Sequence, residues 1–191
     1  MYDRDFATAE GLLQKTLQLY AHHGEVSGNP QITYSSVIIA NWRMGTALTW
    51  LERPEESLPF FDTAIDLLGL QLARDPDDRA VGRRLAILRG TKAQAYGEMG
   101  EVDMGMELLM QANDWFEAQV AAEPDTPSAH RSVAVGYQVI GDLLWDGERK
   151  DEACQWFQKT LDKWLEVDER FGLSDFDSEE PRKVREDLSE C

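Results

Sequence analysis

The sequence predicts an all-α fold built as a stack of antiparallel helix pairs. Three observations predict it: the chain resembles itself at a step of 48 residues, apolar residues recur at steps of three and four, and turn residues separate segments of about 20 residues. A fixed period of a few tens of residues is typical of supersecondary units that bury their apolar faces against one another. The positions in register are Gly45, Ala93 and Gly141; Ser57, Gly105 and Ala153; Phe61, Leu109 and Phe157; Asp66, Asp114 and Asp162; and Pro76 and Pro124.

The periodic segments predict seven long helices and a weaker eighth helix after Ser178. In the segment 55–74, for example, apolar residues form one stripe at helical spacing. No stretch alternates with a period of two, so no sheet is expected. The predicted long helices span residues 3–23, 31–51, 55–74, 78–98, 102–122, 127–146 and 150–170.

Several helix ends have a local chemical reason. Thr126, followed by a proline, is a good N-cap, because a hydroxyl can accept from the first backbone N–H groups and proline lacks the N–H that would go unpaired. Asp77 or Asp78 is expected to cap the segment 78–98. Gly100 and Gly147 are expected to end their helices in the left-handed conformation.

The recurring positions resemble the tetratricopeptide repeat. Its Leu-Gly pair is matched by Met44-Gly45 and Ile140-Gly141, and its Ala-x3-Phe element by Ala153 and Phe157. The period of 48 is longer than the usual ~34, and the Asp-Pro breaks resemble lengthened bacterial repeats. The position of the family's tryptophan holds other residues, Asn41, Arg89 and Tyr137. The resemblance implies a right-handed α-α superhelix, a scaffold that binds proteins or peptides rather than an enzyme, and often a place in a larger signalling protein.

The register predicts one repeat domain over residues 1–172, with units at 31–74, 78–122 and 127–170 and a half unit at 3–23. The half unit is either a natural cap or a sign that the chain is a piece of a longer protein. Because an uncapped repeat exposes an apolar face, self-association through residues 3–23 is an alternative function. Residues 173–191 form either a charged tail or a capping helix.

The composition of the chain limits the classes of partner that it is expected to bind. The chain has 36 acidic and 19 basic residues and a formal net charge of −17, so phosphate backbones and anionic lipid surfaces are repelled. No apolar run is long enough to span a bilayer, and the first ten residues do not resemble a signal peptide. Cys154 and Cys191 are expected to be unpaired, which fits a reducing compartment. A cytoplasmic protein that binds neither nucleic acid nor membrane is therefore expected.

No residue pattern predicts a catalytic, cofactor or metal site. Adjacent His22 and His23 cannot share a helix face, and His130 has no cysteine or acidic partner at ligand spacing. Phosphate-binding glycine loops and the nucleophile-elbow pattern are absent from the sequence. An enzyme on a helical scaffold is the least favoured alternative.

The resemblance also implies a partner-binding groove lined by the first helix of each pair. Trp42 and Trp145 are the proposed aromatic anchors, with core packing between repeats as the alternative; Trp115, Trp156 and Trp164 are expected in the core. Carried over by register, the groove positions are Trp42, Thr46, Thr49, Gly90, Gln94, Gly97, Gln138, Asp142 and Trp145. Arg89 is added to the predicted groove as a cation on the same set of helices.

Cations on the same helices could receive an acidic peptide: Arg43, Arg89 and Lys92. The carboxylate clamp of co-chaperone members of the family is not reproduced, because its positions hold Ile39, Ile87 and Val135. A receptor for chaperone tails is therefore not expected.

Overall fold

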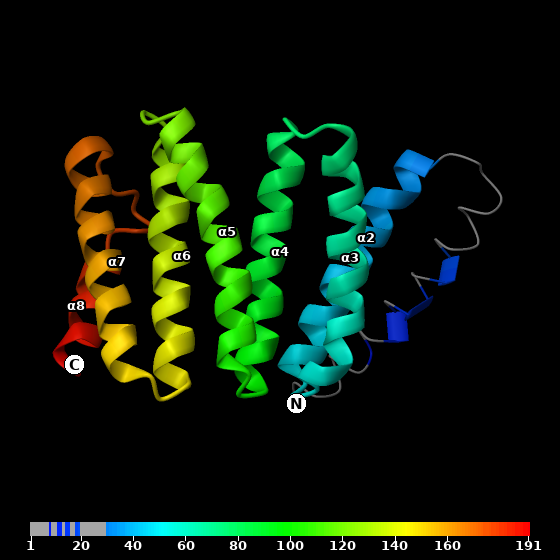
Figure 1. Cartoon of the computed structure of the whole chain (residues 1–191), viewed down its shortest axis with the longest axis horizontal. Helices are drawn as coiled ribbons and strands as arrows, with labels where there is room; N and C mark the ends of the chain where they lie inside the picture. Colours follow the sequence, from blue (N-terminus) through cyan, green and yellow to red (C-terminus); the bar gives the residue numbers. More distant parts are fainter. Residues whose placement is uncertain (1–7, 9–10, 13, 16–17, 20–29) are drawn as a thin grey trace. The chain divides into compact units, whose positions relative to one another are not determined.

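The computed structural model describes residues 8, 11–12, 14–15, 18–19 and 30–191. These residues contain no strand, and 30–191 hold seven helices that run in chain order (Figure 1). All six predicted long helices after residue 30, and the short C-terminal helix, are confirmed. The helices are α2 (Pro30–Trp50), α3 (Pro54–Arg74), α4 (Arg79–Glu98), α5 (Val102–Ala122), α6 (Pro127–Asp146), α7 (Lys150–Phe171) and α8 (Glu180–Ser189).

Internal contacts divide the chain into two compact units, Met1–Met99 and Gly100–Cys191. We call them unit 1, which contains α2 to α4, and unit 2, which contains α5 to α8. The predicted half unit 3–23 lies largely outside the described residues, and one continuous repeat domain over 1–172 stays a prediction.

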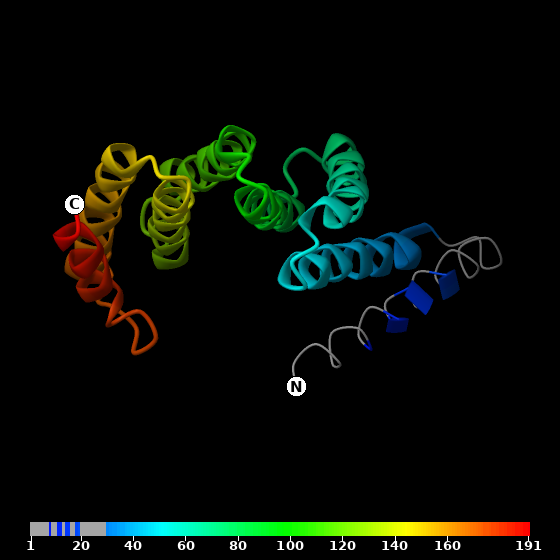
Figure 2. The same cartoon turned by 90° about the horizontal axis from the view of Figure 1, so that it is seen from below.

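Unit 1 is held together by an apolar core shared by its three helices. Ile38 of α2, Phe61 and Leu68 of α3, and Leu85 and Leu88 of α4 belong to one buried cluster. Helix α2 packs against α3, and α3 packs against α4 (Figure 2). The amphipathic stripes identified in the sequence therefore face one another, as helix packing requires.

Unit 2 repeats this arrangement with one helix more. Helix α6 packs against α5 and α7, and α8 lies along α7 (Figures 1 and 2). Its fully buried side chains include Ile140 and Leu144 of α6 and Trp164 of α7. Ile140 belongs to the predicted Leu-Gly pair of the family, so the large apolar residue at this position serves the core.

A glycine and a phenylalanine pack together in the two predicted repeat pairs that lie within one unit, α2 with α3 and α6 with α7. A Cβ atom on Gly45 would lie 2.7 Å from the Phe61 ring, and one on Gly141 would lie 2.5 Å from the Phe157 ring. The rings are buried at 0% and 3% exposure. Position 45 and position 141 therefore require glycine because the aromatic ring fills the space of a side chain.

The turn inside each predicted pair places one residue in the left-handed region, again in register: Glu52 (φ 58°), Gly100 (φ 76°) and Glu148 (φ 59°). The prediction for Gly100 is confirmed, but the prediction for Gly147 is wrong. Gly147 has φ −80°, and Glu148 takes the left-handed conformation in its place. Left-handed backbone strains a glutamate more than a glycine, so the turn geometry overrides local preference here.

The two predicted caps have different outcomes. Asp78 caps α4 as predicted, since its carboxylate accepts from the backbone N–H groups of Ala80 and Val81 at 3.0 Å each. Thr126 occupies the N-cap of α6 without a side-chain capping bond. Its hydroxyl instead lies 3.4 Å from the carboxylate of Glu123, so the predicted chemistry of that cap is wrong.

The C-terminal segment is a capping helix rather than a frayed tail. Pro181 and Val184 of α8 are buried against unit 2. Cys154 of α7 and Cys191 form a disulfide, so the prediction of two unpaired cysteines is wrong. The pairing depends on α8 folding back along α7, which cysteine spacing in the sequence does not reveal. It also removes one ground for the cytoplasmic prediction, because disulfides are typical of oxidising compartments.

Candidate functional site

The predicted groove residues of α2 lie on a partly covered helix surface. Trp42 is half-buried and packs against the core cluster of unit 1. The hydroxyls of Thr46 and Thr49 donate to backbone carbonyls one turn earlier, at 2.9 and 3.0 Å. This packing is the expected alternative for Trp42, whose role as a partner anchor stays a prediction.

On α4, the predicted cationic residues differ in their surroundings. Lys92 is buried and forms an ion pair with Asp62 of α3, so its charge is already neutralised within unit 1. Arg89 is half-buried beside an open hollow between α3 and α4. Removal from water lowers the pKa of Arg89, and no described side chain forms an ion pair or hydrogen bond with it. Gln94, one turn further along, is exposed.

On α6, the predicted residues Gln138, Asp142 and Trp145 lie beside α8. The Gln138 amide donates to Asp142 at 2.8 Å and reaches Asp187 of α8 at 3.4 Å. Asp142 and Trp145 line one hollow together with Asp187 and Glu190 from the C-terminal segment. The α6 part of the predicted groove is thus bordered by the chain's own C-terminal helix.

The carboxyl group of Asp142 lies close to other acidic side chains. Burial raises its pKa to about 6, and the nearby carboxylates of Asp187 and Asp146 add to the rise, while the hydrogen bond from Gln138 opposes it. The residue as a whole is nevertheless exposed to solvent. This hollow is therefore acidic, with Asp142, Asp146, Asp187 and Glu190 in its lining.

The structure groups the predicted residues of α2 and of α6 into two sets, one in each unit. Trp42, Thr46 and Thr49 share a face of α2 in unit 1, and Gln138, Asp142 and Trp145 share a face of α6 in unit 2. Because each set belongs to a different unit, a single continuous groove stays a prediction.

One recurring apolar position on the same helices was missed as a site. The sequence predicts only that no carboxylate clamp is formed at this position, which holds Ile39, Ile87 and Val135. In the structure, Ile39 is 48% exposed and Val135 is 37% exposed, while Ile87 is half-buried. A β-branched apolar residue that recurs in register and remains accessible could have been recognised from the 48-residue step combined with the core stripe of each helix.

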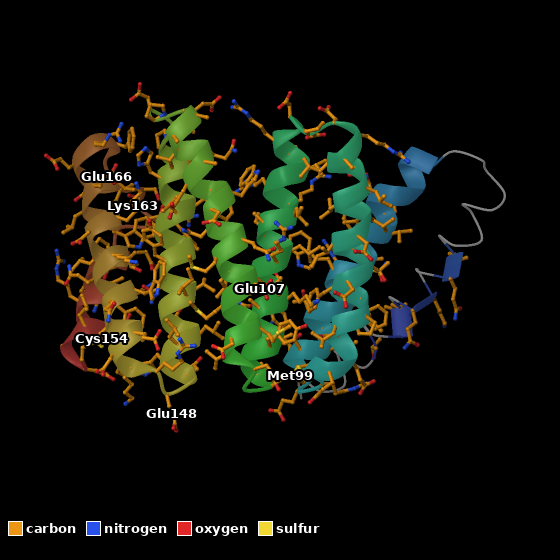
Figure 3. All side chains as sticks on the ribbon, in the orientation of Figure 1. Met99, Glu107, Glu148, Cys154, Lys163 and Glu166 are labelled. Carbon is orange, nitrogen blue, oxygen red and sulfur yellow. A yellow bond between two sulfur atoms is a disulfide. The ribbon has the colours of Figure 1, made fainter. Side chains whose placement is uncertain are left out.

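The partners of His130, which is 1% exposed, were also missed. Its Nδ1 lies 3.0 Å from Lys163 Nζ and 3.1 Å from Glu166 Oε1, and its Nε2 lies 2.8 Å from the Pro124 carbonyl oxygen. Figure 3 places Lys163 and Glu166 near one end of α7, with Cys154 towards the other. Because both ring nitrogens have partners and the ring is enclosed, His130 joins α6 to α7 rather than facing a substrate.

Among the tryptophans expected in the core, only Trp164 is fully buried, at 1% exposure. Trp156 is half-buried and packs against Tyr137, with ring centroids 5.4 Å apart. Trp115 is also half-buried and meets the edge of the neighbouring Phe116 ring.

Two further findings on the described residues concern metal ions and membranes. They contain no group of three or more histidine, cysteine, aspartate or glutamate side chains arranged to hold a metal ion. Within the same residues, no helix combines the length and apolar character needed to cross a bilayer.

Neither a protein-family model nor a curated protein matches this chain. Among solved structures, the MamA protein is similar at 20% identity and a TM-score of 0.41, covering 88% of this chain and 80% of that one. The designed helical repeat protein DHR64 is similar at 15% identity and 0.41, covering 98% and 94%. The DHF119 filament is similar at 13% identity and 0.39, covering 98% and 95%. The chain is an all-α helical repeat protein on the grounds of its own helices and their 48-residue register.

Proposed function

We propose that this chain is a non-enzymatic scaffold that binds a protein or peptide segment along the first helices of its repeats. These helices are α2, α4 and α6, and they carry all of the predicted groove residues. The finer assignment to lengthened tetratricopeptide repeats, and to a larger signalling or regulatory protein, is supported by the sequence resemblance alone.

The observation that carries the proposal is the recurring accessible aliphatic position on these helices. Ile39 and Val135 leave 48% and 37% of their surface exposed. An exposed apolar residue is unremarkable when it stands singly, but one that recurs at the same register position of equivalent helices offers each unit the same kind of apolar contact for an extended or helical partner. Polar groove residues stand two turns further along the same helices, at Thr46 and Asp142.

Capture of a partner from a cell lysate by the immobilised chain tests the proposal. Ile39→Asp and Val135→Asp are expected to lower the yield of a specifically captured protein several-fold, because each replaces an exposed aliphatic contact with a charge. The matched control is Met110→Asp, which changes an apolar side chain of 37% exposure on α5, a second helix. Equal loss in the control, or no capture above that of bare beads, would contradict the proposal.

Self-association is the second candidate function. Leu12 and Leu19 are both helical residues, and they are 60% and 68% exposed. If these residues pair with a second copy, the sedimentation coefficient should rise with protein concentration, and Leu12→Asp with Leu19→Asp should abolish the rise. A monomer at every concentration would exclude this alternative.

A further inference from the structure

A hollow between α3 and α4 of unit 1 combines apolar walls with one cation. It is open to solvent, has a volume of about 470 Å³, and is lined by aliphatic side chains of both helices, by Asp66 and by the guanidinium-bearing Arg89. Leu70 on its edge is 55% exposed. The aliphatic residues that line it are Ile65, Leu70 and Leu85. An open hollow of this size has room for one side chain of a partner segment.

Arg89 lacks a counter-ion among the described residues. Asp66, the acidic residue on the same hollow, is exposed and forms no ion pair with it in this part of the chain. A guanidinium that is partly removed from water without a carboxylate or carbonyl partner loses hydration that nothing replaces. Partial burial accordingly lowers the pKa of Arg89. The charge is thus held in a position where an incoming anion would be favoured.

The equivalent place in unit 2 contains a carboxylate that the Arg89 hollow of unit 1 lacks. One repeat further along, Tyr137 stands at the register position of Arg89, and Glu117 stands at that of Gly69. There the Tyr137 hydroxyl donates to Glu117 Oε1 at 2.9 Å, and the Asn113 amide donates to the same oxygen at 2.6 Å. Unit 2 therefore supplies its own carboxylate to the space between its helices.

In unit 1, Gly69 and Arg89 stand at the register positions of Glu117 and Tyr137. Gly69 has no side chain at the carboxylate position, and a Cβ added there would meet nothing within 4 Å. Arg89 replaces a neutral phenol with a cation. We propose that the Arg89 hollow binds the carboxylate side chain of a partner segment, a glutamate flanked by aliphatic residues, in the place that Glu117 occupies in unit 2. This inference rests on the proposed scaffold function and names the chemistry of its ligand.

Charge and shape together favour this occupant over a purely apolar one. The guanidinium can form a bidentate pair with a carboxylate, which is stronger and more directional than a contact with a neutral group. The walls formed by Ile65 and Leu85 can cover the methylene groups of the glutamate and the neighbouring aliphatic side chain. A peptide with glutamine in place of glutamate fits the same space and lacks only the charge.

Side-chain NMR of Arg89 can test the inference without knowledge of the natural partner. The probes are N-acetyl-Leu-Glu-Leu-amide and its glutamine analogue, titrated into the whole ¹⁵N-labelled chain while the Arg89 Nε–H signal is followed. Arg89→Gln identifies that signal by its loss. The glutamate peptide is expected to shift it saturably, with a dissociation constant at least tenfold lower than that of the glutamine peptide.

Gly69→Glu is the decisive variant, with Gly69→Gln as its neutral control. The introduced carboxylate should pair with Arg89 and weaken binding of the glutamate peptide at least tenfold, and it should do so more than the neutral amide of the control. Far-UV circular dichroism verifies that both variants keep their helices. An unsaturable shift, equal affinity for the two peptides, or unchanged binding in Gly69→Glu would overturn the inference.

The lysate experiment separates this inference from the proposed function. If the wild-type chain captures a partner and Gly69→Glu captures it equally well, the scaffold function stands and the Arg89 hollow is not its contact. If the peptide binds but nothing is captured from lysate, the hollow binds carboxylates while the scaffold proposal fails.

Discussion

At the residue scale, the close contact of a glycine with an aromatic ring determines how tightly two helices of a pair can pack. Gly45 lies under the Phe61 ring with no room for a side chain. The sequence carries a second combination at these register positions, Ala93 with Leu109, in which a larger residue accompanies a smaller one. The two combinations keep the sum of side-chain volumes similar, as close-packed interiors require.

We therefore expect Gly45→Ala to destabilise the chain by about 1–3 kcal/mol, because the new methyl group forces the buried ring to move. Phe61→Leu should relieve this clash, so that the double variant is more stable than the sum of the two single effects predicts. Urea denaturation followed by circular dichroism measures all four proteins. As a control, Gly69→Ala has free space at its Cβ and should raise stability by up to about 1 kcal/mol. Strictly additive effects would contradict the proposed contact.

The acidic hollow beside α8 predicts a pH dependence. The pKa of Asp142 is raised to about 6 in the folded chain, from an ordinary value of 3.8. The proton on Asp142 therefore stabilises the fold below about pH 4, and this contribution is lost as the pH rises through about 6. An asparagine amide at this position cannot ionise, and its carbonyl oxygen can still accept from Gln138.

Asp142→Asn should consequently be more stable than the wild type at about pH 7, and the difference should shrink towards about pH 5. Because Asp142 is exposed, solvent screening limits the effect to about 1 kcal/mol or less. Comparing the variant with the wild type at each pH cancels the titration of other carboxylates, including Asp177, whose pKa is lowered chiefly by its hydrogen bonds from Arg131. A difference that is the same at both pH values would contradict the prediction.

At the element scale, the sequence predicted helix positions well because helix boundaries have local causes. The Asp78 cap and the helix-starting Pro127 act within one turn, so a single sequence reveals them. The left-handed Glu148 and the Cys154–Cys191 disulfide could not be predicted in this way. Both depend on which segments meet in three dimensions, and the same is true of Lys163 and Glu166 around His130.

The repeat register also continues further along the chain than the sequence alone indicated. Val184, buried at 1% exposure, stands in register with Leu88 of α4, which is buried at 0%. Pro181 similarly stands in register with Leu85 and Val133, all three being buried. Helix α8 therefore buries residues at the register positions that the first helices of the repeats also bury. The sequence does not reveal these buried positions, because only one side of this short helix is covered and the remaining residues are mostly charged.

One covalent and one polar attachment hold α8 in place. The disulfide fixes its C-terminal end to α7, and Asp177, buried before α8, accepts two hydrogen bonds from Arg131 of α6 at 2.9 and 3.0 Å. Replacing both cysteines by serine should leave α2 to α7 folded while the backbone amides of α8 exchange with solvent at least tenfold faster. Hydrogen exchange followed by mass spectrometry resolves the C-terminal peptide. Unchanged protection of α8 in the double serine variant would show that packing and Asp177 suffice.

At the scale of the whole molecule, the chain consists of two compact units with separate cores. In a repeat protein, most stability comes from contacts between neighbouring helices, so a part of the chain can fold alone when its own core is complete. Unit 2 meets this condition, since Ile140, Leu144 and Trp164 are buried among its helices. It also has a covered C-terminal end in α8 and a disulfide entirely within the unit.

We therefore expect a chain cut between Met99 and Gly100 to yield a C-terminal half, Gly100–Cys191, that folds independently. Its circular dichroism spectrum should be strongly helical, and its urea unfolding should be cooperative, with a slope in the range of about 1–3 kcal/mol/M that is typical of small domains. His130→Ala is a useful companion variant, because loss of its contacts to Lys163, Glu166 and the Pro124 carbonyl should lower the unfolding midpoint of this half. A broad, non-cooperative transition of the unmodified half would instead show that its helices depend on unit 1, and the two units would then have to be treated as a single cooperative repeat array.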